Sequence, residues 1–359
     1  MRLTLRESVI DDTALIPAAT AEVNATTWPL HDANVRGRVY PEVFGAPGNG
    51  VCAGSPALLL DIFPAATQYV LIAGHTVLAP TVRIHNFGQD PPWVDSYSVF
   101  HVADGLGQVC AVIDANEKGN LVDEGDELWC EWLSDARSGA AGDVLAHWMS
   151  QSALRVDPGR LEAATQALNG YVLGGYVDER VRPLEWVADN LLPILPVTLG
   201  RDVDGLFPLV YQHHIRAAEA VAHLEVGPSC IPTSAIVYDG EPITEMRLQY
   251  RRRADTGDYL GTAVADENSN DYCGKARDRY RGDAHDGRYS RDVTTDVVYD
   301  SATADRIVAS IVERNALRAR STQYDLDRTV WGALVKAGRF VTITDADRSW
   351  SSKPAWVTS

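Results

Sequence analysis

The sequence predicts an α+β fold that is mainly β, in which strands joined by turns form a barrel or a sandwich and a helical insert follows. Over the first 135 residues, short apolar runs such as 69–73 and 109–113 alternate with Gly, Pro, Asn and Asp, which is typical of strands joined by turns. No stretch from 36 to 132 keeps a helical period for more than about two turns, as a parallel α/β fold would require. Helical periodicity begins only near Gly142, and strand-like patterning returns from Val197 onward.

The 359 residues exceed what one ordinary hydrophobic core holds, so we expect several modules. The changes of pattern divide them into an N-terminal β module (1–141), a helical insert (142–195), a second β region (196–300) that contains a polar loop (266–292), and a C-terminal helix plus strands (301–359).

In the N-terminal module, the runs 69–73 and 109–113 are predicted strands, and the Gly/Pro segment 46–50 is a predicted surface turn. Three helices are predicted in the insert. The first begins near Asp143, the second has Asp157 as N-cap and Pro158 at its first position, and the third opens with Pro183.

The second β region starts with strands on either side of an Asp204-Gly205 turn signal. Residues 244–250 alternate apolar and polar side chains, which indicates a strand with one buried face. Between 266 and 292 there is no Leu, Ile, Val, Met, Phe or Trp. We therefore expect a long exposed loop there, either mobile or ordered by packing on a neighbouring chain.

The last region opens on a helix for which Ser301 is a plausible N-cap. Apolar residues from Ala304 to Val312 recur on one face of this helix. A strand at 340–345 follows, and residues 350–359 are expected to form an extended tail.

A net charge of −17 disfavours binding to the phosphate backbone, so we expect no specific nucleic-acid binding. The densest basic run, Arg251-Arg252-Arg253, is followed by Asp255 and Asp258 and is interpreted as a solvated strand end. No window approaches the roughly 20 apolar residues of a membrane span. The amino terminus also has no apolar run of signal-peptide length, so the product is expected to stay in the compartment where it is made.

The five cysteines are widely spaced and form no CxxC pair, which favours reduced core thiols over a disulfide framework or a zinc site. The cysteines are Cys52, Cys110, Cys130, Cys230 and Cys273. Cys52 and Cys230 are poor candidates for a nucleophile, because no basic activator is encoded near either of them.

Neither the histidines nor the acidic clusters have the spacing that is typical of a metal site. His213 and His214 are adjacent and would point to opposite faces of a strand, and His75 and His85 lack a nearby pair of carboxylates. The acidic run 123–127 lacks the residue order of a calcium loop. Residues 283–287 are more typical of a flexible turn than of a site.

The chain contains no G-x-S-x-G elbow, no phosphate-binding P-loop and no H-E-x-x-H helix. We therefore predict no catalytic residues, no cofactor-binding residues, no metal ligands and no cofactor, and we expect that the protein is not an enzyme. A pair of distant carboxylates, as in a glycosidase, is defined only in three dimensions and stays open.

Short motifs follow one another in a characteristic order. They are Tyr40-Pro41-Glu42-Val43-Phe44-Gly45, 69–75, Asp143-Val144-Leu145, Val156-Asp157, Gly175-Tyr176-Val177, Pro183-Leu184-Glu185-Trp186, Asp204-Gly205-Leu206, Thr303-Ala304 and 338–345. This order resembles the central baseplate or tail-tip hub proteins of long-tailed bacteriophages and of related gene-transfer particles.

The resemblance implies a homotrimer whose paired, tube-like β-barrel domains form a pseudo-sixfold ring, joining the sixfold tail tube to threefold distal components. The barrels would come from the N-terminal β module and from the β segments after Val197, with the helical insert attached to them. Its implied partners are the distal tail protein ring, the tape-measure protein and the central fibre or spike proteins, and DNA passes through the lumen. The implied location is the virion tail tip, after synthesis in the bacterial cytoplasm. The alternatives are another tail component, such as a distal tail or fibre-attachment protein, or a cell-wall or carbohydrate-degrading enzyme.

Overall fold

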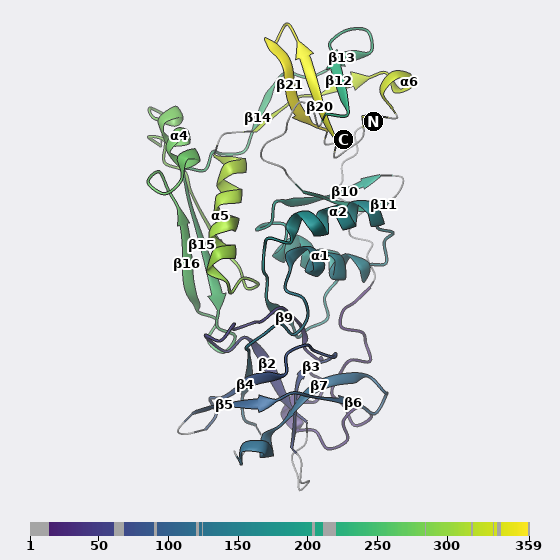
Figure 1. Cartoon of the computed structure of the whole chain (residues 1–359), viewed down its shortest axis with the longest axis vertical. Coiled ribbons are helices and arrows are strands. Elements are labelled where there is room, and N and C mark those ends of the chain that lie inside the picture. The colour runs from purple at the N-terminus through teal and green to yellow at the C-terminus, as the bar shows by residue number, and fades with distance from the viewer. Residues whose placement is uncertain are drawn as a thin grey trace.

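The computed structural model describes residues 14–60, 68–89, 92–119, 122–123, 125–202, 205–210, 220–283, 285–316, 319–332, 334–335 and 339–357. The molecule is elongated (Figure 1), with the N-terminal sheet at one end, the C-terminal strands at the other and most helices between them. Strands outnumber helices in the described residues, and the predicted α+β, mainly β class is confirmed.

A seven-stranded antiparallel sheet forms the N-terminal module, in the order β5-β4-β8-β2-β3-β7-β6. Only Val99 separates β5 from β6, so one bent stretch pairs first with β4 and then with β7. The sheet therefore curls into a half-barrel. Its strands are β2 (Ser55–Leu59), β3 (Tyr69–Ala73), β4 (Thr81–Asn86), β5 (Trp93–Ser98), β6 (Phe100–Ala103), β7 (Val109–Asp114) and β8 (Leu128–Trp132), and a short helix, η2 (Ala115–Lys118), follows β7.

Strand β3 is buried on both faces, which explains its continuous apolar run. Val70 and Ile72 face the inside of the curl, where Trp132 also packs. Leu71 faces the opposite way and packs in a cluster with Val23, from the segment before β1 that also contains the short helix η1 (Ala33–Val35).

The helical insert is joined to the half-barrel by β1 (Glu42–Phe44), which pairs with β9 (Gly175–Val177). The insert contains the three predicted helices, α1 (Ala141–Ser150), α2 (Pro158–Leu168) and α3 (Pro183–Asn190). Asp157 caps α2 as predicted, accepting hydrogen bonds from the backbone N–H groups of Gly159 and Arg160. The hairpin of β10 (Val197–Asp202) and β11 (Gly205–Val210) follows, and Asp204 of the predicted turn lies outside the described residues.

A three-stranded sheet lies beside the insert. Its central strand β15 (Glu245–Arg252) pairs antiparallel with β16 (Tyr259–Ala265) and parallel with β17 (Ser290–Thr294). Alternate residues of β15 are buried as predicted, and helix α5 (Ser301–Asn315) packs on β15 and β16. The N-cap of α5 is Asp300 rather than the predicted Ser301, because the Asp300 carboxylate reaches the backbone N–H of Thr303.

The prediction that 266–292 is one long loop is wrong, because the segment contains helix α4 (Asp271–Tyr280) and the start of β17. Asn270 caps α4 by accepting a hydrogen bond from the backbone N–H of Tyr272. Cys273 and Ala276 are fully buried in the same core as α5. Two small side chains three residues apart anchor this helix, so it needs no large aliphatic residue.

The C-terminal end combines strands from two stretches of chain. The three-stranded sheet here has the order β12-β20-β21, and β12 and β20 run parallel. Residues 222–239 therefore meet residues 319–356, and the predicted extended tail contains β21, which is paired with β20. The elements are β12 (Ala222–Glu225), β13 (Cys230–Pro232), β14 (Val237–Asp239), β18 (Ala319–Ser321), β19 (Tyr324–Leu326), α6 (Arg328–Trp331), β20 (Phe340–Asp345) and β21 (Trp350–Trp356), with β13 paired to β19 and β14 to β18.

Candidate functional site

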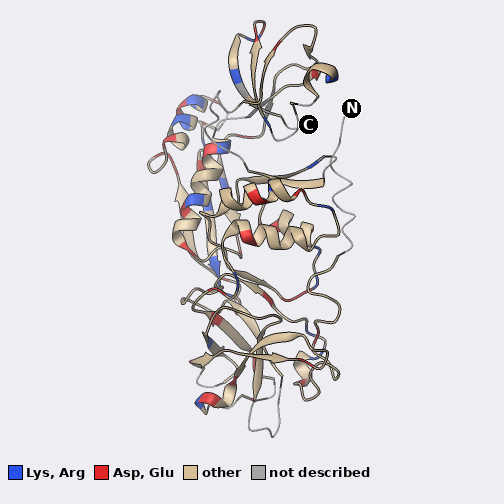
Figure 2. Ribbon diagram, turned by 45° about the vertical axis from the view of Figure 1, so that its right-hand side comes forward, with Lys and Arg blue, Asp and Glu red and all other residues tan. Residues whose placement is uncertain are grey.

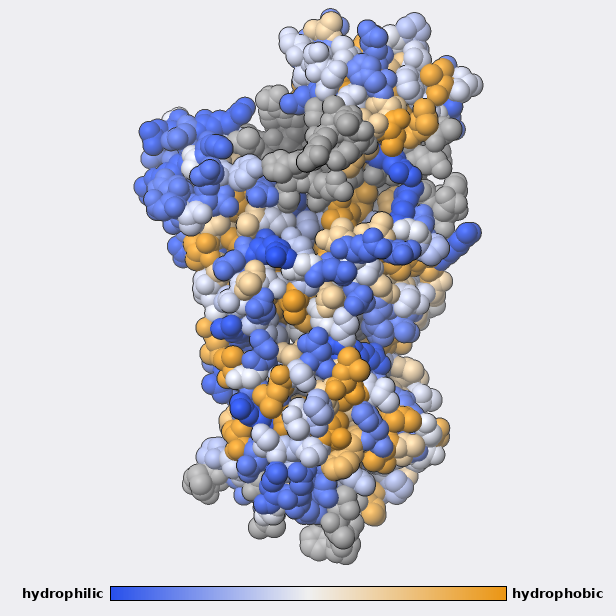
Figure 3. All heavy atoms as spheres, viewed as in Figure 1, coloured by the Kyte–Doolittle hydropathy of each residue, from blue (hydrophilic) through white to orange (hydrophobic). Residues whose placement is uncertain are grey.

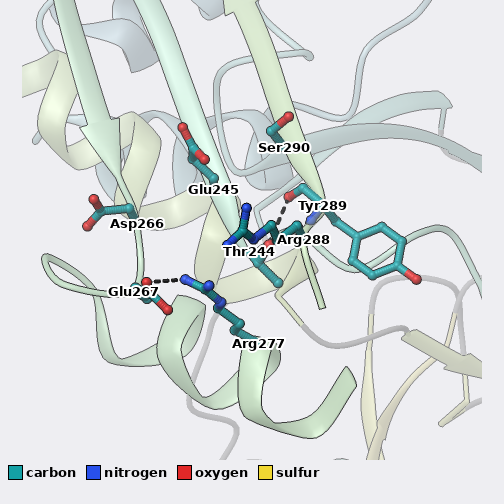
Figure 4. A pocket seen from close by; sticks show the side chains of 8 residues that line it. All are labelled: Thr244, Glu245, Asp266, Glu267, Arg277, Arg288, Tyr289 and Ser290. Atoms are coloured by element: carbon teal, nitrogen blue, oxygen red, sulfur yellow. Dashed lines mark hydrogen bonds and ion pairs between the residues drawn. The ribbon is translucent and has the colours of Figure 1, made fainter. Parts of the chain in front are cut away.

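A polar hollow of about 330 Å³ lies at one end of the β16-β15-β17 sheet (Figure 4). Most of its lining side chains are charged, and two of them, Glu267 and Arg277, form an ion pair. The lining residues are Thr244, Glu245, Asp266, Glu267, Arg277, Arg288, Tyr289 and Ser290.

Four stretches of chain supply this lining. Glu245 begins β15, Asp266 follows β16, Arg277 lies on α4, and 288–290 leads into β17. Because β15 and β17 run parallel, Thr244 lies beside Tyr289, and the backbone N–H of Tyr289 donates to the Thr244 hydroxyl at 2.8 Å. This bond closes one wall of the hollow.

Two of the carboxylates in the hollow are neutralised by arginines. Glu267 pairs with Arg277, and Glu245 pairs with Arg247 at 2.6 Å. Asp266 instead accepts hydrogen bonds from the Ser269 hydroxyl at 2.8 Å and from two backbone N–H groups. The hydroxyl, followed by the backbone donors, lowers the pKa of the Asp266 carboxyl, so Asp266 stays ionised at neutral pH.

The acidic side chains of the hollow are held by ion pairs and hydrogen bonds. A glycosidase needs one carboxyl group that is kept protonated by a raised pKa. Every described carboxyl group whose pKa departs clearly from its usual value departs downward. These groups are Glu42, Glu117, Asp266, Asp283, Asp327 and Asp345.

The cysteines lie where the sequence predicts. All five are buried and none forms a disulfide. Burial raises the pKa of the Cys52 and Cys273 thiols to about 11, and that of Cys110 to about 12. Thiols held protonated in this way are poor nucleophiles.

The histidines considered as metal ligands do not come together in the described structure, and His75 and His85 make different contacts. His75 accepts a hydrogen bond from the backbone N–H of Val43 at 3.1 Å, and its other ring nitrogen lies 2.9 Å from the Thr76 carbonyl. His85 lies 2.7 Å from a carboxylate oxygen of Glu131. His213 and His214 lie outside the described residues. Within the described part of the chain, no group of three or more His, Cys, Asp or Glu side chains is arranged to hold a metal ion.

The acidic segments 123–127 and 283–287 stabilise turns in the structure. Asp126 accepts hydrogen bonds from the Asn86 amide at 2.7 Å and from the backbone N–H of Asp123 at 3.0 Å. Asp283 accepts the Tyr289 hydroxyl at 2.5 Å and the backbone N–H groups of His285 and Gly287.

The arginine run at the end of β15 is engaged within the chain. Arg251 donates to the Tyr299 carbonyl, Arg252 pairs with Asp296, and Arg253 pairs with Asp255. In Figure 2, Lys and Arg also gather on α4, the helix that supplies Arg277 to the hollow.

Apolar side chains are exposed on the half-barrel. Val94 of β5, Phe100 of β6 and Val109 of β7 keep 49%, 46% and 42% of their surface accessible. Figure 3 shows apolar residues scattered among polar ones over this end of the molecule, whereas the region of α4 is hydrophilic.

Sequence reasoning missed the hollow, because residues from four stretches build it and α4 was predicted as a loop. The available signal was Asn270 as an N-cap, followed by Cys273 and Ala276 on one helical face.

Searches against family models, curated proteins and solved structures found nothing that matches this chain. None of the described helices has the length and apolar character needed to cross a membrane.

Proposed function

We propose that this chain is a structural virion protein, the tail-tip or baseplate hub of a long-tailed bacteriophage. The observation that carries the proposal is the curled seven-stranded sheet, whose bent β5–β6 stretch exposes Val94 and Phe100. A ring subunit needs surfaces on which copies of the same chain can pack, and it needs no active site. The order of the motifs along the chain supports the same role.

In this role three copies form a ring that joins the sixfold tail tube to threefold fibre or spike components. The ring contacts the distal tail protein and the tape-measure protein at the virion tail tip. DNA passes through the lumen, and the net charge of −17 limits its adhesion to the wall.

The charges in the hollow favour this structural role over the enzyme alternative. Glu267 is paired with Arg277, and Asp266 is held ionised by hydrogen bonds. Neither environment prepares a general acid.

Electron microscopy of the purified full-length protein tests the proposal, together with its mass in solution. A ring with three-fold symmetry and a central opening supports the hub, particularly if the gene follows a tape-measure gene. A flat six-fold ring favours a distal tail protein. Clearing of cell walls that is lost when Glu267 is changed to Gln favours the enzyme.

A further inference from the structure

Strand β16 is an edge strand with an unusual composition. Its seven residues, Tyr-Leu-Gly-Thr-Ala-Val-Ala, include no charge and no proline. One edge pairs with β15, and no described residue forms a backbone hydrogen bond to the other edge. Alternate N–H and C=O groups along that edge are therefore open to another strand.

Such an edge is a liability unless something covers it. Edge strands are ordinarily protected by charged side chains, proline or bulges. The opposite edge of the same sheet follows this rule, since β17 carries exposed Arg291 and Asp292. The β11 strand likewise contains Pro208. Strand β16 carries no charged side chain and no proline.

The two faces of β16 differ. Ala263 and Ala265 are buried on the face where α5 packs. Leu260 and Val264 point the other way and keep 49% and 46% of their surface exposed, with the exposed Thr262 between them. The outward face is thus apolar at both ends and carries a hydroxyl at its centre.

We propose that the free edge of β16 pairs antiparallel with β16 of a second copy of this chain, about a two-fold axis at Thr262. In this register Leu260 faces Val264 of the second copy, and Thr262 faces its own counterpart. On the inner face Gly261 meets Ala263, and the large Tyr259 meets the small Ala265. Apolar pairs and Thr–Thr pairs are favourable across antiparallel strands, and no like charges meet.

This self-complementarity selects a second copy as the occupant. An interface about a two-fold axis places the same strand on both sides, so each residue needs a suitable partner within one short segment. The two three-stranded sheets become one six-stranded sheet, which removes the exposed edge. The contact is separate from the proposed three-copy ring: in the purified protein it joins two copies, or two such rings into six copies, and it is not part of the arrangement proposed for the tail tip.

Cross-linking of the full-length protein tests the register. Directly opposed residues of paired strands lie within disulfide reach of each other, so Thr262→Cys should form a covalent dimer under mild oxidation with diamide. The matched control is Gln249→Cys, an exposed residue on the neighbouring internal strand β15. All five native cysteines are buried and do not compete. A Thr262→Cys protein that cross-links no more than Gln249→Cys would overturn the pairing.

Mass in solution gives an independent readout. Thr262→Lys places two ammonium groups opposite each other, so the mass measured by light scattering should fall twofold, whereas Gln249→Lys keeps the wild-type mass. Circular dichroism checks that both variants are folded. Equal masses for all three proteins would contradict the inference. A three-fold ring that persists in Thr262→Lys keeps the hub proposal intact, and the lack of any ring in the wild type counts against the hub alone.

Discussion

The indole rings of Trp148 and Trp186 are stacked, with their centroids 4.2 Å apart and their planes 16° from parallel. They join α1 to α3, and Phe44 of β1 packs edge-on against Trp186 at 5.5 Å. These three aromatic side chains connect the helical insert to β1, the strand that leads into the half-barrel.

Removing one ring of the stack should destabilise the fold strongly. Trp148 is fully buried, so Trp148→Ala leaves a large cavity and should lower the free energy of unfolding by about 3–5 kcal/mol. Urea denaturation measures the loss. Leu78→Ala, at a position that is 75% exposed, is the control and should change stability by less than about 0.5 kcal/mol. A loss below about 1 kcal/mol for Trp148→Ala would show that the stack is not part of the core.

Gly45 should tolerate no side chain. Its φ of +57° disfavours other residues, and an added Cβ would lie 1.9 Å from the carbonyl oxygen of Leu173. Gly107 also has a positive φ, +85°, but a Cβ there meets nothing within 4 Å. Gly45→Ala should therefore lower the melting temperature well beyond Gly107→Ala. Similar melting temperatures for the two variants would refute the close approach of these segments.

His75 should make stability depend on pH. Burial lowers the pKa of its imidazole, and Glu42 opposes this effect only in part. The unfolded chain then binds a proton more readily than the folded one. Stability is fully present above the usual pKa of about 6.5 and is lost as the pH falls below it, by at most about 1.4 kcal/mol per pH unit.

The comparison between pH 7 and pH 5 isolates this residue. Wild type should lose up to about 2 kcal/mol more than His75→Gln, whose amide oxygen can still accept the backbone N–H of Val43 but does not titrate. Denaturant titrations at the two pH values measure the difference. An identical pH dependence in both proteins would show that His75 is not held neutral.

The cysteines should be unreactive in the native state. All five are buried, and burial raises the pKa of the Cys52 and Cys273 thiols to about 11 and that of Cys110 to about 12. A thiol reagent such as DTNB should therefore label the native protein at pH 8 far more slowly than the urea-unfolded protein, in which all five react. Rapid native labelling would contradict the burial.

The sequence predicted the elements that depend on local signals. Asp157 with Pro158 placed α2, and the alternation of Met246, Leu248 and Tyr250 placed β15 and its buried face. These predictions succeed because an N-cap signal or an alternation of apolar and polar residues lies within a few neighbouring positions of the sequence.

Other features escaped prediction because they depend on distant contacts. Helix α4 is anchored by Cys273 and Ala276 in a core supplied by α5, so its polar composition suggested a loop. The parallel pairing of β12 with β20 joins residues over 100 positions apart. The hollow around Arg277 likewise exists only once four stretches of chain have met.

Cryo-electron microscopy of phage particles that carry a tagged copy of this chain tests the hub proposal most directly. The account predicts three copies at the tail tip, arranged as a ring around the DNA path between the tail tube and the distal fibre or spike, with the half-barrels facing one another. Density for the tag at any other part of the particle, or its absence from purified particles, would contradict it.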